Sequence, residues 1–296
     1  MKIPQRVAVR RARVSRVFSN RNLRQQGWFE AATLAIALVL FFATAQRTAS
    51  QELAAASPQR DPQALGIIVS ALNAMGGASV LAGIQDIRGS GTVTYNWAGS
   101  QVQAAVIVKG RGLSQFRLDA TLPDGIYSWG VSNGQRFRKN ADGTISAPPY
   151  GTRPCFENTP LPFVQLLAAM QDSSNSVSYI GLESRNGNTV NHIRITSAGS
   201  ASSTTSTATL ANKTGTIDIF IDNTTNLIQS VLTIAYSADF PGQTYPREIQ
   251  YSNHQVLNGV VVPLSIVELI DGEQTLAMQL SQVSFNIGLS DNDFQP

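Results

Sequence analysis

The sequence predicts a mainly β protein of the α+β class, with one antiparallel sheet of about 10–12 strands and two or three covering helices. Three observations predict this class. From Ile87 onward, apolar and polar residues alternate with a period of two, which is typical of half-buried strands. Asn-Gly or Asp-Gly dipeptides at 133, 142, 186, 258 and 271 predict tight turns between such strands. Two apolar segments with helical features lie outside this alternation.

Residues 1–45 have the pattern of an export signal peptide. Eight basic residues precede the fifteen-residue apolar run Ala31–Ala45, which is shorter than the roughly 20 apolar residues of a membrane-spanning helix. Ala43 and Ala45 form an A-x-A pattern that predicts cleavage after Ala45, and hence a periplasmic or secreted protein. The alternative is an uncleaved N-terminal helix that anchors the chain in the membrane, with Trp28 extending its apolar run.

Residues 46–60 are small and polar without periodicity, so we predict a flexible linker, followed by a single domain over residues 61–296. A helix is predicted at the start of this domain. Asp61 suits its N-cap, Pro62 suits its first position, and apolar residues follow at helical spacing. A short second helix is predicted within 78–84.

The remaining elements follow from the same patterns. The segment Pro160–Met170 predicts a helix that lies across the sheet, with Thr159 as its N-cap. The Ser/Thr-rich tract Ser197–Thr214 predicts a mobile loop between two strands. The predicted strands are 92–97, 101–108, 115–120, 126–132, 135–139, 176–184, 189–196, 216–221, 227–236, 247–254, 260–269 and 275–287.

The charge balance argues against nucleic acid as a partner. The chain has 22 basic and 19 acidic residues, and removing the eight basic and one acidic residue of positions 1–45 leaves 14 basic and 18 acidic residues. The mature protein is therefore mildly acidic and lacks the basic surface that nucleic-acid binding requires. Cys155 is the only cysteine, so no intramolecular disulfide can form.

The sequence offers little chemistry for catalysis. Residues 130–134 match the G-x-S-x-G nucleophile elbow around Ser132, but a strand rather than a helix is predicted to follow, so a hydrolase is only an outlying alternative. His192 and His254 are the only histidines and lie in predicted strands. Their spacing, and that of the single cysteine, matches no metal-binding motif. We therefore predict a non-enzymatic protein without a metal or cofactor.

The C-terminal part of the chain resembles outer-membrane lipoprotein-sorting proteins of the LolA type. In that group, "Y…NGvxvP" strands are followed by "v.fN.gl.d..F.p", and Thr216–Val231 also looks like the group's strand-turn-strand with an aspartate, Asp222, before the turn. The sequence is similar as well to uncharacterised exported bacterial proteins. The matching C-terminal positions are Tyr251, Asn258, Gly259, Val262, Pro263, Phe285, Asn286, Gly288, Leu289, Asp291, Phe294 and Pro296.

This resemblance implies a strongly curved sheet that forms an open or half barrel, whose apolar concave face binds a hydrophobic ligand such as an acyl chain, a lipid or a lipidated protein. Peripheral contact with the cell envelope is a further expectation. The alternative is a structural or interaction protein of the envelope in which side chains fill the hollow. The residues predicted to line the hollow are Tyr95, Trp97, Phe116, Leu118, Trp129, Leu167 and Phe220.

Overall fold

A computed structural model describes residues 58–97, 100–132, 135–146, 161–197, 215–236 and 243–296. These residues belong to one compact unit, Ser57–Pro296. The predicted signal peptide and most of the predicted linker and Ser/Thr-rich loop lie outside the described residues, as do Thr159 and Cys155. Gln59 and Arg60, at the end of the predicted linker, contact the first strand after the third helix.

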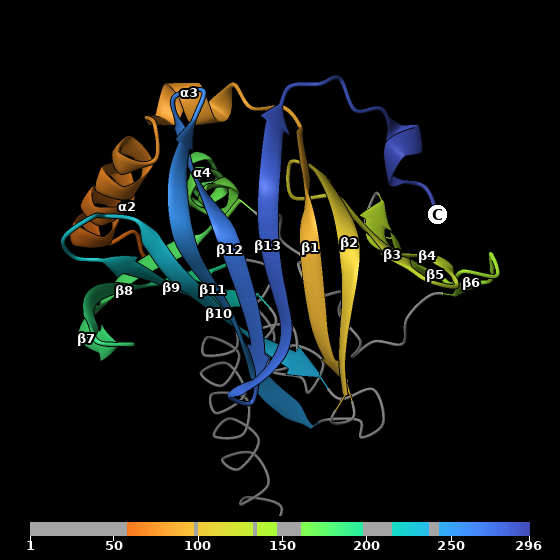
Figure 1. Ribbon diagram of the computed structural model, residues 1–296. Coiled ribbons are helices and arrows are strands. Elements are labelled where there is room, and N and C mark those ends of the chain that lie inside the picture. The colour runs from red at the N-terminus through yellow and green to blue at the C-terminus, as the bar shows by residue number, and fades with distance from the viewer. Residues whose placement is uncertain (1–57, 98–99, 133–134, 147–160, 198–214, 237–242) are drawn as a thin grey trace, which may run out of the picture. The chain divides into compact units, whose positions relative to one another are not determined.

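The described part of the chain contains three α-helices, one short 3-10 helix and thirteen strands (Figure 1). The helices are α2 (Pro62–Ala74), α3 (Ala78–Ala82), α4 (Phe163–Gln171) and the 3-10 helix η2 (Asp291–Phe294). The strands are β1 (Ile87–Trp97), β2 (Ser100–Arg111), β3 (Gln115–Leu122), β4 (Gly125–Ser132), β5 (Gln135–Lys139), β6 (Ile145–Ser146), β7 (Ser176–Arg185), β8 (Asn188–Thr196), β9 (Thr216–Asp222), β10 (Ile228–Tyr236), β11 (Thr244–Leu257), β12 (Val260–Ile270) and β13 (Glu273–Phe285).

All thirteen strands belong to one antiparallel sheet, in the order β6-β5-β4-β3-β2-β1-β13-β12-β11-β10-β9-β8-β7. Two meanders, β1 to β6 and β7 to β13, therefore meet where β1 pairs with β13. This arrangement confirms the predicted mainly β class with an antiparallel, curved and unclosed sheet. The patterns missed β6 and η2, because elements of two and four residues are too short to show a period.

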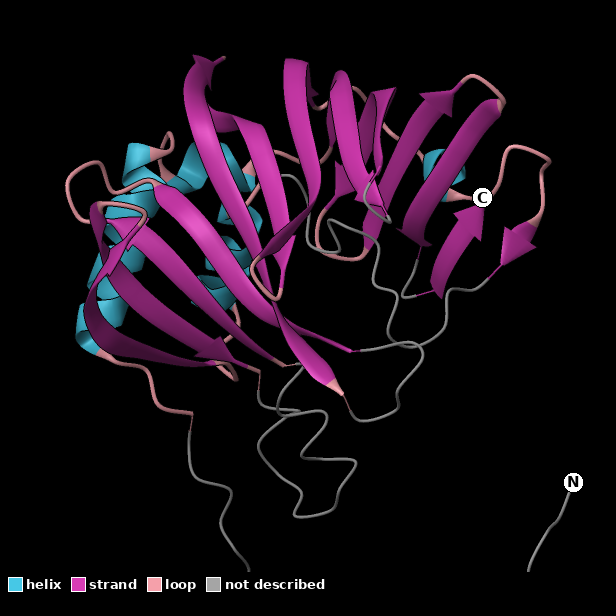
Figure 2. Ribbon diagram, turned by 60° about the horizontal axis from the view of Figure 1, so that its bottom comes forward, coloured by secondary structure: helices cyan, strands magenta, loops and turns pink. Residues whose placement is uncertain are grey.

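The sheet curls strongly around one face, which we call the concave face; the opposite side is the outer face (Figure 2). The rings of Tyr95 on β1 and Trp129 on β4 lie 5.7 Å apart. Three strand spacings of roughly 4.8 Å would separate these strands by about 14 Å in a flat sheet. Gly91 permits the close approach of β13 to β1, because a Cβ there would lie 2.8 Å from the Cα of Leu280 and would clash with the carbonyl of Gln279.

The helices cover the concave face at one end of the sheet (Figures 1 and 2). Asp61 caps α2 as predicted, since its carboxylate accepts the N–H of Gln63 at 2.8 Å. The other oxygen accepts the N–H of Tyr179 at 3.2 Å and so ties the helix to β7. The predicted start of α4 is wrong by three residues: Pro162 occupies its N-cap position and the helix begins at Phe163.

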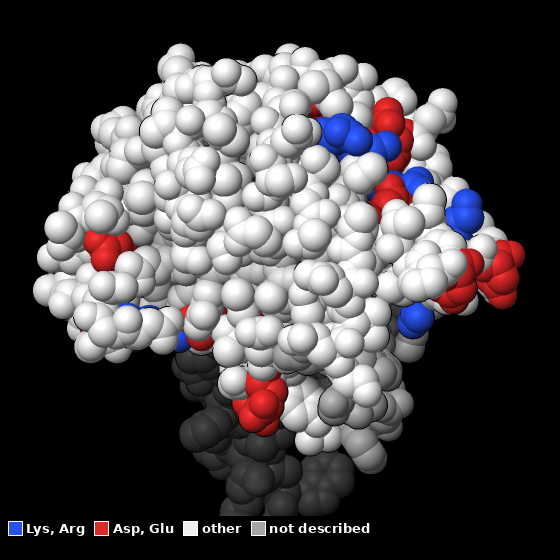
Figure 3. All heavy atoms as spheres, viewed as in Figure 1, with Lys and Arg blue, Asp and Glu red and all other residues white. Residues whose placement is uncertain are grey.

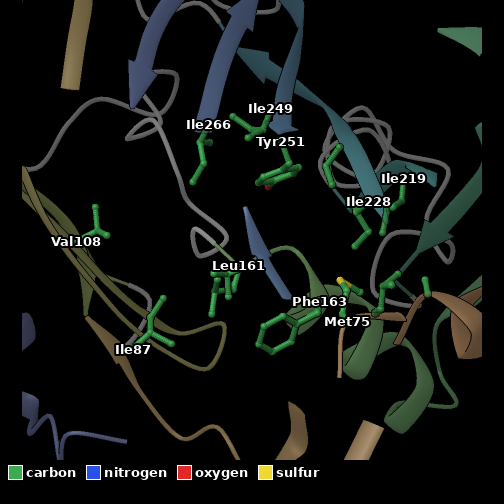
Figure 4. Packing of buried hydrophobic residues seen from close by; sticks show 14 of the residues in the cluster. Met75, Ile87, Val108, Leu161, Phe163, Ile219, Ile228, Ile249, Tyr251 and Ile266 are labelled. Atoms are coloured by element: carbon green, nitrogen blue, oxygen red, sulfur yellow. The ribbon is translucent and has the colours of Figure 1, made fainter. Parts of the chain in front are cut away.

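A single hydrophobic core joins both meanders through α2 and α4. In Figure 4, Ile87 and Val108 lie on one side, Ile219 and Ile228 on the other, and Phe163 between them. A cluster of this size explains how the domain is stable without a disulfide.

The core face also holds one buried ion pair. Arg247 on β11 and Glu268 on β12 are 3% and 1% exposed, and their Nε and Oε2 atoms lie 2.7 Å apart. The hydroxyl of Thr275 donates to the second carboxylate oxygen at 2.7 Å. The sequence did not indicate this pair, because the two residues come from different strands.

Candidate ligand-binding pocket

A pocket of about 320 Å³ opens at the end of the concave face where the helices meet the sheet. Four segments line it: α3 with the loop that follows it, the start of β1, the turn between β2 and β3, and α4 with the residues before it. The lining residues are Leu81, Ala82, Ile84, Gln85, Asp86, Ile87, Gly110, Gly112, Leu113, Leu161, Phe163, Val164, Leu167, Ala168 and Gln171.

The helix α4 divides its faces between the core and the pocket. Val164, Leu167, Ala168 and Gln171 recur at helical spacing and line the pocket. Leu166 is fully buried and belongs to the core. The helix is therefore apolar nearly all round, because core covers one side of it and the pocket lies on another.

The wall at the start of β1 is fixed by the segment that follows β13. The carboxylate of Asp86, which is 5% exposed, accepts the backbone N–H groups of Ile287, Gly288 and Leu289 at 2.8, 3.0 and 3.0 Å. Asn286 adds two contacts to the loop after α3. Its side chain accepts the N–H of Gln85 at 2.7 Å and donates to the carbonyl of Gly83 at 3.0 Å.

Asn286 and Gly288 have the backbone conformation that these contacts require. Their φ angles are +55° and +80°, in the left-handed region that asparagine tolerates and glycine adopts freely. The "fN.gl" positions of the resemblance therefore correspond to a backbone turn that fixes one wall of the pocket.

The chain then crosses the outer face of β3 and β4 and ends there. Phe294 is fully buried, and the Arg111 guanidinium lies 5.5 Å from its ring centroid. Arg111 also pairs with Asp291 and donates to the carbonyl of Leu289 at 2.9 Å. Lys109 and Asp293 form a second ion pair at 2.9 Å. These contacts fasten the C-terminal segment to β2, at the end that carries the pocket.

The pKa of the Asp293 carboxyl reflects this fastening. The hydrogen bond from Lys109 and that from the backbone N–H of Ser290 lower it to about 2. The turn after β9 shows a similar effect at Asp222. Burial opposes its ionisation most strongly, but hydrogen bonds from Thr225 and Thr224 together hold its pKa below the ordinary value.

The structure brings most of the predicted hollow-lining residues to the concave face. Phe116 and Leu118 are buried in the core, Tyr95 and Trp129 pack against it, and Leu167 lines the pocket. Trp97 ends β1, but its side chain lies outside the described part of the structure.

Phe220 lies on the outer face instead, because the core residues of β9 are its neighbours Ile219 and Ile221. All three are almost fully buried, so the period of two is hidden at this point of the strand. The sequence pattern could not tell which side of β9 faces the hollow.

Phe220 is covered by a charged network on this outer face. The Arg185 guanidinium lies 3.7 Å from the centroid of its ring and pairs with Glu248 at 3.0 Å. The His192 ring lies 4.6 Å from the Phe220 ring, between centroids, and is tilted by 40° to it. The ring nitrogens of His192 lie 2.5 and 2.9 Å from carboxylate oxygens of Glu183 and Asp218. The network joins strands β7, β8, β9 and β11 and explains the burial of this histidine.

The structure also bears on the other two possibilities that the sequence raised, a nucleophilic serine and a metal site. Ser132 on β4 pairs with Gln135 on β5, so the next described element is an antiparallel strand and not the helix that a nucleophile elbow requires. The Ser132 hydroxyl accepts a hydrogen bond from Gln295 at 3.2 Å. Among the described residues, no group of three or more His, Cys, Asp and Glu side chains is arranged to hold a metal ion.

The pocket can therefore hold an apolar group. Its polar members are Gln85, Asp86 and Gln171, and the Asp86 oxygens already accept the three N–H groups described above. No helix in the described part of the chain is long and apolar enough to cross a membrane.

No protein-family model and no curated protein matches this chain. Solved structures do match it. An outer membrane lipoprotein-sorting protein domain from Vibrio parahaemolyticus aligns with a TM-score of 0.50 and 10% identity, over 78% of this chain and 95% of that one. A LolA superfamily protein from Nitrosomonas europaea aligns with a TM-score of 0.50 and 10% identity, over 79% and 97%. The predicted LolA-like fold is thereby confirmed.

Proposed function

We propose that this chain is an exported, non-enzymatic binding protein for a hydrophobic ligand, namely an acyl chain of a lipid or a lipidated protein. The pocket at the end of the concave face carries this proposal. Its volume of about 320 Å³ falls within the range of roughly 300–1,000 Å³ that is usual for ligand sites. Eight of its fifteen lining residues are leucine, isoleucine, valine or phenylalanine.

The expected driving force is the burial of methylene groups. Each buried methylene contributes about 0.8 kcal/mol, which corresponds to an affinity gain of up to about fourfold per added carbon. The gain should stop once the chain is longer than the pocket. The chain length at which it stops would measure how far the ligand extends along the concave face toward Tyr95 and Trp129.

Leu167→Trp tests this proposal directly. The larger side chain would project into the pocket from α4 and should weaken the binding of a long-chain fatty acid at least tenfold in a fluorescence titration. Leu182→Trp is the matched control, because Leu182 lies on β7 and is 57% exposed. Equal affinity of both variants, or the lack of saturable binding by the unmodified protein at every chain length, would contradict the proposal.

Export is part of the proposal and is supported by the sequence of residues 1–45. The absence of catalysis is supported by the hairpin at Ser132 and by the structural contacts of His192. An ester hydrolysis assay of Ser132→Ala checks this part, and we expect no change from the unmodified protein.

A second function has one observation in its favour. Phe116 and Leu118 on the concave face are each only 3% exposed, so this part of the hollow is already packed. A structural or interaction protein of the envelope would have such a filled core. Organic extraction of the purified protein separates the two functions, because co-purifying lipid supports the binding protein. Recovery of a specific envelope protein without any lipid supports the second function.

A further inference from the structure

We propose that the end of the molecule at which the pocket opens is a lipid-docking surface, which rests on an uncharged or zwitterionic bilayer while an acyl chain moves into the pocket. This inference rests on the proposed function of the pocket. It adds the partner from which the ligand comes and the surface that meets it.

Three exposed aliphatic residues line the pocket or adjoin residues that line it. Val80, Leu113 and Ile287 are 49%, 47% and 47% exposed. Leu113 itself lines the pocket, and Val80 directly precedes the lining residue Leu81. The N–H of Ile287 donates to Asp86, another lining residue, at 2.8 Å. We call Val80, Leu113 and Ile287 the rim.

The segments that meet at this end carry no charge. Residues 62–85, 112–116, 255–267 and 286–290 contain no Asp, Glu, Lys or Arg, whereas 14% of the whole chain is charged. The turn between β11 and β12 joins this surface through a hydrogen bond of 3.0 Å from the Val261 N–H to the Met75 carbonyl. In Figure 3 the surface over α3, at the upper end, is accordingly white.

The charged residues that border the rim are largely neutralised. Asp86 is buried and accepts three N–H groups, and Arg111 pairs with Asp291. Lys109 pairs with Asp293, and Arg88 lies on β1 two residues after Asp86. Paired cations do not form the basic cluster that recognises anionic lipid, so binding should depend little on salt or on anionic lipid.

An aliphatic rim without charges favours a bilayer over a protein partner. Protein interfaces are enriched in aromatic residues and arginine and have a polar margin, whereas the rim consists of valine, leucine and isoleucine among small residues. Apolar side chains without charged neighbours enter the acyl boundary of a bilayer at low cost. Because Leu113 of the rim also lines the pocket, the acyl chain would pass from bilayer to protein with little exposure to water.

Flotation with neutral phosphatidylcholine vesicles tests the proposal. The triple variant Val80→Ser, Leu113→Ser, Ile287→Ser should bind the vesicles at least tenfold more weakly than the unmodified protein. The control is Ile126→Ser, Ile180→Ser, Leu182→Ser, whose residues are 53%, 47% and 57% exposed on β4 and β7 and lie outside the pocket lining. The control should bind as the unmodified protein does. All forms share one N-terminus, so it does not affect the comparison.

Acyl-chain binding in solution separates failure of this inference from failure of the proposed function. The variant Val80→Ser, Ile287→Ser leaves the pocket lining unchanged and should bind a soluble fatty acid normally while binding vesicles less. Equal vesicle binding by the rim and control variants would overturn the inference, as would normal fatty-acid binding by a protein that never binds vesicles. If the rim variants bind vesicles unchanged but no longer recover one specific envelope protein that the unmodified protein binds, the rim would be assigned to a protein partner instead.

Discussion

At the scale of single residues, the C-terminal motif shows why loosely spaced positions can be informative. Asn286, Gly288, Asp291 and Phe294 each have a distinct structural role. In this order, the four residues form a turn, a fixed loop, an ion pair and a buried contact that anchors the segment. The partner that they share is the region of Asp86 and β2, which lies about 180 to 200 residues earlier in the chain.

Asp86→Ala should lower the free energy of unfolding by about 2–4 kcal/mol, because three backbone N–H groups would lose a charged acceptor in a buried place. Urea denaturation measures this loss. Asp142→Ala is the control, since Asp142 accepts the Thr144 N–H in an exposed turn and its loss should be much smaller. Equal losses in the two variants would contradict the role assigned to Asp86.

The lowered pKa of Asp293 predicts that this residue contributes to the loss of folding stability in acid. Its pKa of about 2 is below the ordinary value near 3.8, so its ionised form stabilises the folded state above pH 4. This contribution is lost as the pH falls from about 4 to 2. The difference in unfolding free energy between the unmodified protein and Asp293→Asn should therefore shrink over that range. Asp271→Asn, in the exposed turn between β12 and β13, serves as the control. A difference that stays constant with pH would refute the assignment.

At the scale of elements, glycines show where the sheet depends on close approach. Gly91→Ala should destabilise the protein by about 2 kcal/mol or more, because its Cβ would overlap the backbone of β13 where β1 crosses a bulge. Gly66→Ala is the matched substitution in α2. Nothing lies within 4 Å of its added Cβ, and alanine favours a helix over glycine by about 0.5–1 kcal/mol, so stability should rise. Thermal unfolding of the two variants gives the sign of each change in stability. A change of the same sign in both variants would contradict this account.

Pro263 illustrates how an element tolerates a residue that its pattern disfavours. It lies within β12 and has no N–H for the sheet ladder. Its partner on β11 is His254, and the paired residues of β12 and β13 begin only at Ser265. Pro263 therefore lies outside the pairing of β12 with β13, at a position where a missing N–H removes no hydrogen bond to β13.

At the scale of the whole molecule, the charge on the mature protein and its location depend on how the N-terminus is processed. Cleavage after Ala45 would leave Gln46 as the first residue and remove eight basic residues, which makes the protein mildly acidic. Mass spectrometry of the protein from its natural compartment should give this N-terminus. An intact N-terminus at Met1 would contradict the predicted cleavage and favour the anchored alternative.

The sequence by itself determined which segments form strands and which form helices. Period-two alternation, as in β2 and β3, marks a strand with one buried face, and the cap of α2 at Asp61 can be read from two residues. These signals are local, so they do not depend on how the sheet closes. The resemblance of the C-terminal motif added the curvature and the apolar concave face.

Only the tertiary structure decided which strand faces look into the hollow and where a pocket remains. Phe220 lies on the outer face. Its strand is buried on both sides, so no local pattern distinguishes the two faces. The pocket depends on the meeting of α3, α4 and the turn between β2 and β3, whose residues are up to 90 positions apart. Such positions are fixed by packing between distant segments, because the free energy of burial depends on contact in space and not on separation along the chain.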